Sequence, residues 1–386
     1  QFLIFAKKEQ LPEKLYLTAA DNRLPLDLSK DISLSMIYEE WKKGIGTELT
    51  LERMEAGEAV GWEGDDRYAT EIVVPFFRRE RPQRKREALT GKTCARKLHM
   101  AYPMQEWLYL KLYGSSHREE ELIACHLADF CEEIKQTYGV DSFFMRYADP
   151  KPHVRLRFYG ESEKLYAILP VVLEWSRGLL EAEVIGDLAI VPYEREVERY
   201  GGIGLIEKAE QLFFADSTVV AQIIQNRRFQ TIGMELEEIA AASVLFYVTG
   251  FYETLPEQLA FLEANYHDTI YEKKWKERKQ RLITQLDIET NWTGFCQSED
   301  GSWLYPLWEN RKEAVIRYRE AMKGQVSDLE KNDIVASVLH LHCNRLLGTN
   351  RDLEQKVMTL AESVLYAKKY VLGKKGGYGT GKCEAS

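Results

Sequence analysis

The sequence of 386 residues is poor in cysteine, and its cysteines show no metal-binding spacing. Six Cys are too few for a disulfide scaffold, and no Cys-x-x-Cys pair or Cys/His cluster is present. No apolar run reaches the roughly 18 residues that a membrane span requires, and the N-terminal residues do not have the pattern of a signal peptide. We therefore expect no metal or cofactor and a reducing, cytoplasmic environment.

Several motifs of common enzyme classes are also missing. The sequence has no Gly-x-Ser-x-Gly elbow and no Walker A loop. Gly201-Gly-Ile-Gly lacks the third glycine of a dinucleotide fingerprint. Serine hydrolases, P-loop enzymes and dinucleotide-dependent enzymes are therefore disfavoured.

The charge balance is acidic, with one basic exception. Lys plus Arg is 52 and Asp plus Glu is 61, giving a net charge of −9, which argues against extensive coating of nucleic acid. Residues 78–97 nevertheless hold nine basic and two acidic residues without apolar periodicity. This tract is either a solvated linker or a segment that meets an anionic partner such as RNA.

The composition, 45% hydrophobic and 29% charged, is typical of a folded protein of two or three domains. Residues 1–77 are predicted to be β-rich, with hairpins at 15–18/24–28 and 59–62/68–77 and a short helix over 35–41. Residues 78–101 are predicted to be a basic linker, 102–373 a second domain, and 374–386 a flexible Gly-rich tail. The first residue is Gln rather than Met, so we expect the chain to be the C-terminal part of something longer.

The second domain is predicted to begin with a sheet and continue with helices. Its expected strands are 107–113, 143–147, 153–159 and 189–193. Its expected helices are 119–138 (ended by Gly139), 163–181, 204–214, 217–228, 233–250, 255–266, 268–286, 308–323, 331–347 and 351–372. The predicted fold class is α+β: a small mixed, β-rich N-terminal segment followed by a mainly helical domain with an antiparallel sheet.

Two arginines are expected to lie side by side on the strand His153–Tyr159. Side chains alternate along a strand, so Arg155 and Arg157 share one face, roughly 7 Å apart, while apolar residues occupy the other. Each guanidinium could bind a carboxylate through two hydrogen bonds. The alternative is that this is the solvated face of a half-buried sheet.

A short polar segment follows the last predicted strand. If it turns helically, Glu196 and Arg199 are neighbours, and Gly201-Gly202 permits unusual backbone angles. The alternative is a surface ion pair that contributes little to stability.

The helix predicted over 331–347 carries two stripes. Its core stripe contains Val335, Leu339, His342 and Leu346, and its polar stripe contains Asp333, Ser337, His340 and Asn344. His342 is interpreted as a core histidine with a polar partner. His340 is the better candidate for proton transfer, because histidine titrates near neutrality. On a helix the two histidines point to different sides, so they do not form a zinc pair.

Five motifs occur in a fixed order: Trp107-Leu-Tyr-Leu-Lys-Leu-Tyr, Phe144-Met-Arg-Tyr-Ala-Asp-Pro with His153-Val-Arg-Leu-Arg-Phe, Glu196-Val-Glu-Arg-Tyr-Gly-Gly, Ala209-Glu-Gln-Leu-Phe-Phe-Ala-Asp-Ser, and His340-Leu-His-Cys-Asn-Arg. Together they resemble the C-terminal elimination domain of class I lanthipeptide (lantibiotic) dehydratases over residues 105–372. Residues 1–77 resemble the end of the glutamylation domain that precedes it in full-length dehydratases.

The resemblance implies a two-step dehydration. Glutamate is moved from glutamyl-tRNA, the co-substrate of the full dehydratase, onto Ser and Thr of a precursor peptide. The elimination domain then expels it and leaves dehydroalanine or dehydrobutyrine. By resemblance, Arg155, Arg157 and Arg199 bind the adduct and stabilise the leaving group. Glu196 orients an arginine or assists proton transfer, and His340 is the acid/base.

Three further residues have second-rank roles by the same resemblance. Arg146 and Lys111 are candidates for substrate binding, and either could equally be structural. His342 is the alternative to His340.

The resemblance also implies partners. These are a precursor peptide with a leader, glutamyl-tRNA through the upstream domain, a lanthionine cyclase, an exporter that would supply any membrane association, and a second copy of the chain. Two other functions stay open: a thiopeptide pyridine-forming cyclase of the same fold, which usually lacks a glutamylation-type segment, and a non-catalytic module that binds the precursor peptide.

Overall fold

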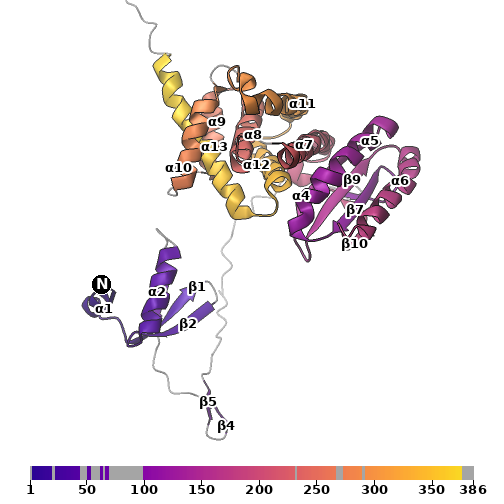
Figure 1. Ribbon diagram of the computed structural model, residues 1–386. Coiled ribbons are helices and arrows are strands. Elements are labelled where there is room, and N and C mark those ends of the chain that lie inside the picture. Colours follow the sequence, from indigo (N-terminus) through magenta and orange to yellow (C-terminus); the bar gives the residue numbers. More distant parts are fainter. Residues whose placement is uncertain are drawn as a thin grey trace, which may run out of the picture. The chain divides into compact units, whose positions relative to one another are not determined.

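The computed structural model describes residues 2–19, 22–43, 50–53, 61–63, 66–68, 99–230, 233–266, 273–288 and 292–375 (Figure 1). The chain forms two compact units, residues 1–87 and 88–386. The division falls within the predicted linker 78–101. The basic tract 78–97 and the tail 376–386 lie outside the described residues.

The first unit is built on a small antiparallel sheet of order β2-β1-β3. Its elements are α1 (Phe2–Lys8), β1 (Lys14–Ala19), β2 (Asn22–Asp27), α2 (Asp31–Lys43), β3 (Thr50–Arg53), β4 (Gly61–Glu63) and β5 (Asp66–Tyr68). The β1–β2 hairpin confirms the first predicted hairpin, and its core contains Leu15, Leu26 and Ile37. β4 pairs with β5 at the second predicted hairpin, of which residues 69–77 lie outside the described part. The sequence patterns did not predict α1 or β3.

The second unit begins with a four-stranded antiparallel sheet of order β10-β7-β9-β8. Its strands are β7 (Trp107–Tyr113), β8 (Asp141–Tyr147), β9 (His153–Tyr159) and β10 (Asp187–Ile190). β6 (Met100–Ala101) pairs with β11 (Tyr193–Glu194) in a separate two-stranded sheet. The predicted strand 189–193 is therefore wrong, because the chain leaves one sheet after Ile190 and joins another at Tyr193. Pro192 lies between them and has no N–H to continue a ladder.

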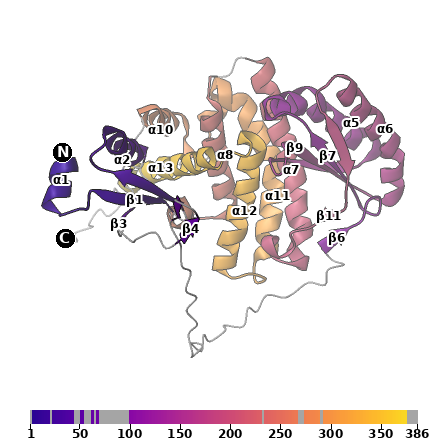
Figure 2. The ribbon, with the colours of Figure 1, turned by 90° about the horizontal axis from the view of Figure 1, so that it is seen from below.

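Two helices cover one face of this sheet, and a third packs against its edge. α5 (Ala128–Tyr138) and α6 (Ser162–Glu181) cover the face that carries Leu156 and Phe158 (Figures 1 and 2). There Phe130 of α5 stacks on Trp175 of α6 at 4.2 Å and meets Phe158 edge-on. The long helix α7 (Ile203–Phe229) packs against the edge strand β8, where Phe214 contacts Phe143.

The predicted helix 119–138 consists of consecutive helical segments of different types. It runs through η1 (Ser116–Arg118), α4 (Glu119–Glu121), a π-helical segment η2 (Leu122–Leu127) and α5. Gly139 ends it with φ 65°, which confirms the predicted glycine stop.

The remainder is a helical bundle. It contains η3 (Glu198–Tyr200), α8 (Leu236–Phe251), α9 (Leu255–Tyr266), α10 (Lys273–Gln285), η5 (Phe295–Gln297), α11 (Glu299–Met322), α12 (Asp328–Leu347) and α13 (Arg351–Lys375). α7, α8, α11 and α12 lie side by side (Figure 2). α8 is buried along almost its whole length and forms the centre of the bundle. The architecture confirms the predicted α+β class.

Two predicted helix boundaries are wrong. α7 is one helix rather than two, because Asp216 and Ser217, which resemble a break in the sequence, make buried hydrogen bonds from mid-helix. α11 begins at Glu299 rather than 308, capped by Ser298, and tolerates Pro306 in its interior. Within the described residues, none of the helices is long and apolar enough to cross a membrane.

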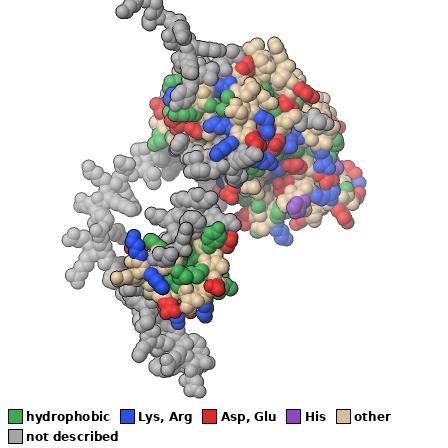
Figure 3. Space-filling view, turned by 60° about the vertical axis from the view of Figure 1, so that its left-hand side comes forward, with side chains coloured by type: hydrophobic (Ala, Val, Ile, Leu, Met, Phe, Trp, Pro, Cys, Tyr) green, Lys and Arg blue, Asp and Glu red, His purple; other side chains and the backbone are tan. Residues whose placement is uncertain are grey.

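Acidic and basic side chains are intermixed over the face that Figure 3 shows. Among the described residues, several exposed pairs join side chains of one helix, such as Lys312 with Glu309 at 2.8 Å. Exposed pairs of this kind contribute about 1 kcal/mol or less each. They therefore do not mark a functional site, in contrast to the buried charges described next.

Candidate active site

Arg155 and Arg157 lie on the same face of β9, as predicted from strand alternation. In the register of the sheet, Arg155 is opposite Lys111 of β7, and Arg157 is opposite Tyr109 of β7 and Phe143 of β8. The side chains that face Arg155 and Arg157 thus come from the two strands that flank β9.

Arg157 is buried, with only 4% of its surface exposed. Its guanidinium carbon lies 4.2 Å from the ring centre of Tyr109, 4.4 Å from that of Tyr193 and 5.0 Å from that of Phe143. Its Nε has no hydrogen-bond partner, and no carboxylate among the described residues is within ion-pair distance. The alternative of a solvated face does not describe this arginine. A buried cation without a counter-ion is costly, so this position is suited to an anion from outside the chain.

Arg155 stacks on an aromatic ring and donates to a histidine. Its guanidinium carbon lies 3.4 Å from the ring centre of Tyr147, and its Nε donates to Nε2 of His153 at 3.2 Å. Nδ1 of His153 in turn meets the Lys151 carbonyl oxygen at 2.8 Å. Burial lowers the pKa of His153, and the charges of Arg155 and Lys111 lower it further. Because like charges opposite each other destabilise a sheet, Lys111 and Arg155 would both gain from a bound anion.

The segment after β11 carries the predicted Glu196 and Arg199. They form an ion pair, with Arg199 Nη1 2.8 Å from Glu196 Oε2. The turn ends at Gly201, where φ is 91°. A Cβ there would lie 2.5 Å from Leu205 Cδ1 and 3.0 Å from Ile334 Cδ1 of α12, so glycine allows the turn to pack closely against that helix.

Arg199 reaches α12 and so approaches His340. Its Nε donates to Ser337 Oγ at 3.2 Å, and Ser337 lies one turn before His340 on the same helix. Burial alone would lower the pKa of Arg199, but Tyr200, Glu196 and Glu354 raise it above its ordinary value. Nδ1 of His340 lies 2.8 and 2.9 Å from the two carboxylate oxygens of Glu354 on α13.

Tyr200 is influenced both by Arg199, its neighbour in the sequence, and by Arg157 of the sheet. Its hydroxyl is buried and has no hydrogen-bond partner in the described part of the chain. Burial raises the pKa of Tyr200, while the nearby charges of Arg199 and Arg157 act to lower it. The charge of Glu196 likewise raises the pKa of Arg157 against the effect of burial. The charges of Arg157 and Glu196 therefore influence each other, and the Glu196–Arg199 pair reaches the helix of His340 through Ser337.

Arg146 lies elsewhere. It alternates with Met145 along β8, so it points to the face opposite that of Arg155. Its guanidinium is buried, 4.0 Å from Glu119, and burial lowers its pKa. The structure thus separates Arg146 from Arg155 and Arg157, whereas Lys111 faces Arg155.

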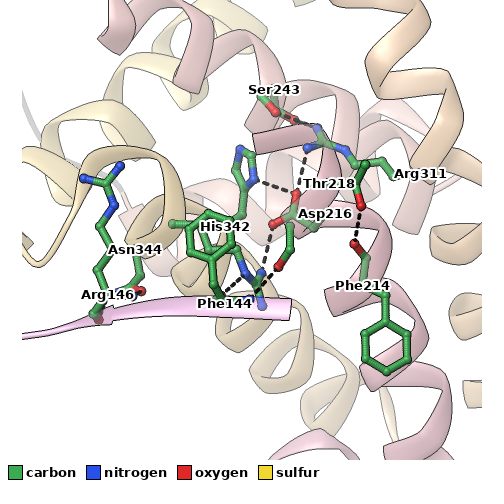
Figure 4. Close-up of polar contacts among 11 residues, drawn as sticks. Phe144, Arg146, Phe214, Asp216, Thr218, Ser243, Arg311, His342 and Asn344 are labelled. Atoms are coloured by element: carbon green, nitrogen blue, oxygen red, sulfur yellow. Dashed lines mark hydrogen bonds and ion pairs between the residues drawn. The ribbon is translucent and has the colours of Figure 1, made fainter. Parts of the chain in front are cut away.

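His342 is in the core, as its stripe predicted. It is fully buried, and its Nδ1 lies 2.9 Å from Asp216 Oδ1. Asp216 also accepts from Arg311 Nη1 at 2.9 Å and Arg345 Nη1 at 2.9 Å (Figure 4). Burial alone would raise the pKa of Asp216, but its contacts with His342, Arg345 and Arg311 lower it. Burial and the two arginines lower the pKa of His342 against the opposing effect of Asp216. His342 therefore serves a buried network, away from Arg155 and Arg157.

Sequence reasoning assigned no role to Asp216, Arg345 or Glu354. Asp216 and Arg345 lay within quoted motifs, and a charge inside an otherwise apolar helix usually indicates a buried partner. No sequence pattern marked Glu354, because its contact with His340 depends on how α13 packs on α12.

With this geometry established, comparison with known proteins is informative. The family described as lantibiotic biosynthesis dehydratase C-term matches residues 107–365. The chain belongs to this family. The predicted resemblance to the C-terminal part of lantibiotic dehydratases is confirmed.

Relatives within the family cover most of the chain. The subtilin biosynthesis protein SpaB of Bacillus subtilis is 38% identical over 379 residues, 96% of this chain and 36% of that protein. The nisin biosynthesis protein NisB of Lactococcus lactis subsp. lactis is 25% identical over 371 residues, 95% of this chain and 36% of that protein. The chain thus spans about a third of the length of these curated relatives.

A solved structure shares the fold. The crystal structure of the tRNA dependent lantibiotic dehydratase MibB from Microbispora sp. 107891 matches with a TM-score of 0.64 and 22% identity, over 96% of this chain and 38% of that one. In the present chain, the described residues include no cluster of three or more His, Cys, Asp or Glu that could hold a metal ion.

Proposed function

We propose that this member of the dehydratase family catalyses elimination of glutamate from glutamylated Ser and Thr side chains of a ribosomal precursor peptide. The products are dehydroalanine and dehydrobutyrine, and the pathway is lantibiotic biosynthesis. The observation that carries the proposal is Arg157, a buried guanidinium with no carboxylate partner among the described residues.

The substrate supplies what Arg157 lacks. A glutamyl ester of serine carries a free carboxylate, and the departing glutamate acquires a second one. Arginine binds carboxylates through two parallel hydrogen bonds, and such bonds are stronger away from water. Arg155, on the same face of β9, supplies a second guanidinium, and Lys111 lies opposite it.

The elimination requires a base and a way to stabilise negative charge. In the proposed step, His340 removes the Cα proton of the esterified residue, and the electron pair forms the Cα=Cβ bond. The Cβ–O bond breaks, and glutamate leaves with the electron pair of that Cβ–O bond on its carboxylate oxygen. Arg157 and Arg199 offset the charge that develops on the leaving group, while Glu196 orients Arg199 at 2.8 Å.

The remaining predicted partners belong to this proposal. The precursor peptide with its leader is the substrate. Glutamyl-tRNA would act through the upstream domain that the resemblance implies. A lanthionine cyclase and an exporter would act next, and a homodimer is the expected assembly. The basic tract 78–97 and its RNA alternative stay untested, because they lie outside the described residues.

The test supplies the chain with a peptide that already carries a glutamyl ester on one serine. We expect the peptide mass to fall by one glutamic acid as free glutamate appears in equal amount. Arg157→Ala and His340→Ala are expected to lower the rate by about 100-fold or more, given what a positioned base or donor contributes.

Arg177→Ala is the matched control, because Arg177 is an exposed arginine of α6 that pairs with Glu181 at 3.6 Å. It should leave the rate unchanged. If Arg157→Ala and His340→Ala eliminate glutamate as fast as this control, the assignment fails and a peptide-binding role is favoured.

A further inference from the structure

We infer that Glu354 is a positioning residue for His340: it holds the imidazole proton on Nδ1 and leaves Nε2 as the atom that accepts the substrate proton. This inference rests on the proposed function, since it defines which nitrogen of His340 acts. Nothing in the sequence pattern of the helix 331–347 pointed to Glu354.

The geometry of the pair carries the inference. Both carboxylate oxygens of Glu354 lie within hydrogen-bond distance of Nδ1, at 2.8 and 2.9 Å. Within the described part of the chain, Nε2 of His340 has no hydrogen-bond partner. The hydrogen bond made by one ring nitrogen fixes the proton there and leaves the other nitrogen as acceptor.

The His340–Glu354 pair is also largely buried. The side chains of His340 and Glu354 are 18% and 14% exposed, respectively. A hydrogen bond that involves a charged group is stronger in such a setting than in water. The pair therefore restrains the ring more firmly than an exposed contact would.

Arg351 also contacts Nδ1 of His340, so the presence of Glu354 determines which ring nitrogen carries the proton. Its Nη1 lies 2.6 Å from Nδ1 of His340 and 3.3 Å from Glu354 Oε2. Two donors cannot face each other at that distance, so a protonated Nδ1 requires the Arg351 side chain, which is 69% exposed, to move aside, whereas Glu354 is 14% exposed and stays in place. The carboxylate of Glu354 favours the protonated Nδ1. Without Glu354, Arg351 would donate to Nδ1 and drive the proton to Nε2, which would block the base.

The fold fixes Glu354 where it is needed. α12 ends at Leu347, Gly348 follows with φ 83°, and α13 starts at Arg351. Asn350 Oδ1 accepts from the Leu353 N–H at 3.0 Å, which anchors the first turn of α13. Glu354 belongs to that turn, where the helix dipole favours negative charge.

Other charged or titratable groups also surround the pair. Arg199 and Glu196 approach from the segment before α7, and the charge of Glu354 contributes to the raised pKa of Arg199. Glu354 also raises the pKa of Cys343 on α12 and of Tyr266 on α9, where burial is the larger cause. A kinetic test of Glu354 must therefore distinguish a change in rate that acts through His340 from one caused by the loss of a negative charge.

The first measurement is steady-state elimination of glutamate from the glutamylated peptide. We expect Glu354→Ala to lower kcat by about 10- to 100-fold, part of the ~10²–10⁴ that a positioned base contributes, with KM changed less than about twofold. Glu354→Gln should recover most of this loss, because its amide oxygen can accept from Nδ1. Asp352→Ala is the matched control, since it removes a carboxylate from the same turn of α13.

A double variant tests whether Glu354 acts through His340. In a His340→Ala background, Glu354→Ala should cause no further loss of kcat. An additional loss as large as that in the wild-type background would overturn the inference.

The second measurement is independent of activity. Nitrogen-15 NMR of the histidine rings, with the His340 signals assigned by their loss in His340→Ala, reports which nitrogen is protonated. We expect Nδ1–H in the wild type and in Asp352→Ala, and Nε2–H in Glu354→Ala. A wild-type His340 protonated at Nε2 overturns the inference even if elimination is observed. A wild-type chain that carries Nδ1–H but does not eliminate glutamate overturns the proposed function and leaves the positioning contact established.

Discussion

Asn344 of α12 completes the hydrogen bonding of Arg146 on the edge strand β8. Its side-chain oxygen accepts from the Arg146 N–H at 3.0 Å, and its Nδ2 donates to the Arg146 carbonyl at 2.9 Å. On the same edge, the Phe144 N–H donates to Ser217 Oγ at 3.1 Å, and the Phe144 carbonyl accepts from Arg345 Nε at 2.8 Å. Side chains of α7 and α12 thus take the place of a fifth strand, which covers an edge that would otherwise be open. They also hold the sheet with Arg155 and Arg157 against the helix with His340.

Removing this contact should destabilise the second unit. Asn344→Ala leaves two buried backbone groups unsatisfied, so we expect the free energy of unfolding to fall by about 2–4 kcal/mol. Urea denaturation followed by circular dichroism measures this change. Gln136→Ala, which removes an exposed side-chain contact with Glu132, is the control and should change stability by less than about 0.5 kcal/mol. Equal effects of the two substitutions would show that the edge does not depend on Asn344.

Asp216 is expected to be the most sensitive carboxylate in the core. Asp216→Asn removes the negative charge that compensates Arg311 and Arg345, so we expect a loss of about 3–5 kcal/mol in the free energy of unfolding. The exposed pair of Glu313 with Arg317 provides the comparison, and Glu313→Gln should cost less than about 1 kcal/mol. Chemical denaturation of both variants measures the difference. A loss at Asp216 no greater than that at Glu313 would be incompatible with the buried network.

His342 should make stability depend on pH near neutrality. Its pKa is lowered in the folded chain from an ordinary value of 6.5, so the unfolded chain binds more protons as the pH falls below that value. The contribution of His342 is therefore fully present above about pH 6.5 and decreases as the pH falls through the acidic side of that value. Denaturation curves over about pH 5.5 to 7.5 measure this slope. His342→Gln should flatten it, and an unchanged slope in that variant would contradict the prediction.

Arg157 is expected to trade stability for function. Because its guanidinium is buried without a carboxylate among the described residues, replacing it by a residue of similar volume removes an uncompensated charge. We expect Arg157→Met to raise the free energy of unfolding by about 1–2 kcal/mol in the absence of substrate. The same variant should lose elimination activity.

Thermal unfolding of the free chain and the peptide assay measure the two effects. Arg345→Met is the contrast, since Arg345 pairs with Asp216 at 2.9 Å and its loss should be destabilising. Destabilisation of Arg157→Met to the same extent would show that Arg157 is a structural residue.

Much of the candidate site followed from local rules, and the exceptions have physical reasons. Alternation along β9 correctly placed Arg155 and Arg157 together, and helical spacing placed Glu196 beside Arg199 and His342 in the core. The same rules divided α7 at Asp216, because a local pattern cannot show that a polar residue in mid-helix has a buried partner 126 positions away. They also missed Glu354, whose contact with His340 arises between two helices. The catalytic roles of these residues stay predictions until the variants are measured.

The sequence by itself determined most strands and helices of the second unit, the faces on which the arginines and histidines lie, and the family to which the chain belongs. These depend on backbone geometry within a few residues and on motifs in a fixed order. Only the tertiary structure decided that Arg157 is buried among Tyr109, Tyr193 and Phe143, with no carboxylate from the described residues beside it. Packing also decided that Glu354, rather than a neighbour in the sequence, meets His340. Burial and charge compensation are set by residues from distant segments, and no local pattern records which of them will meet.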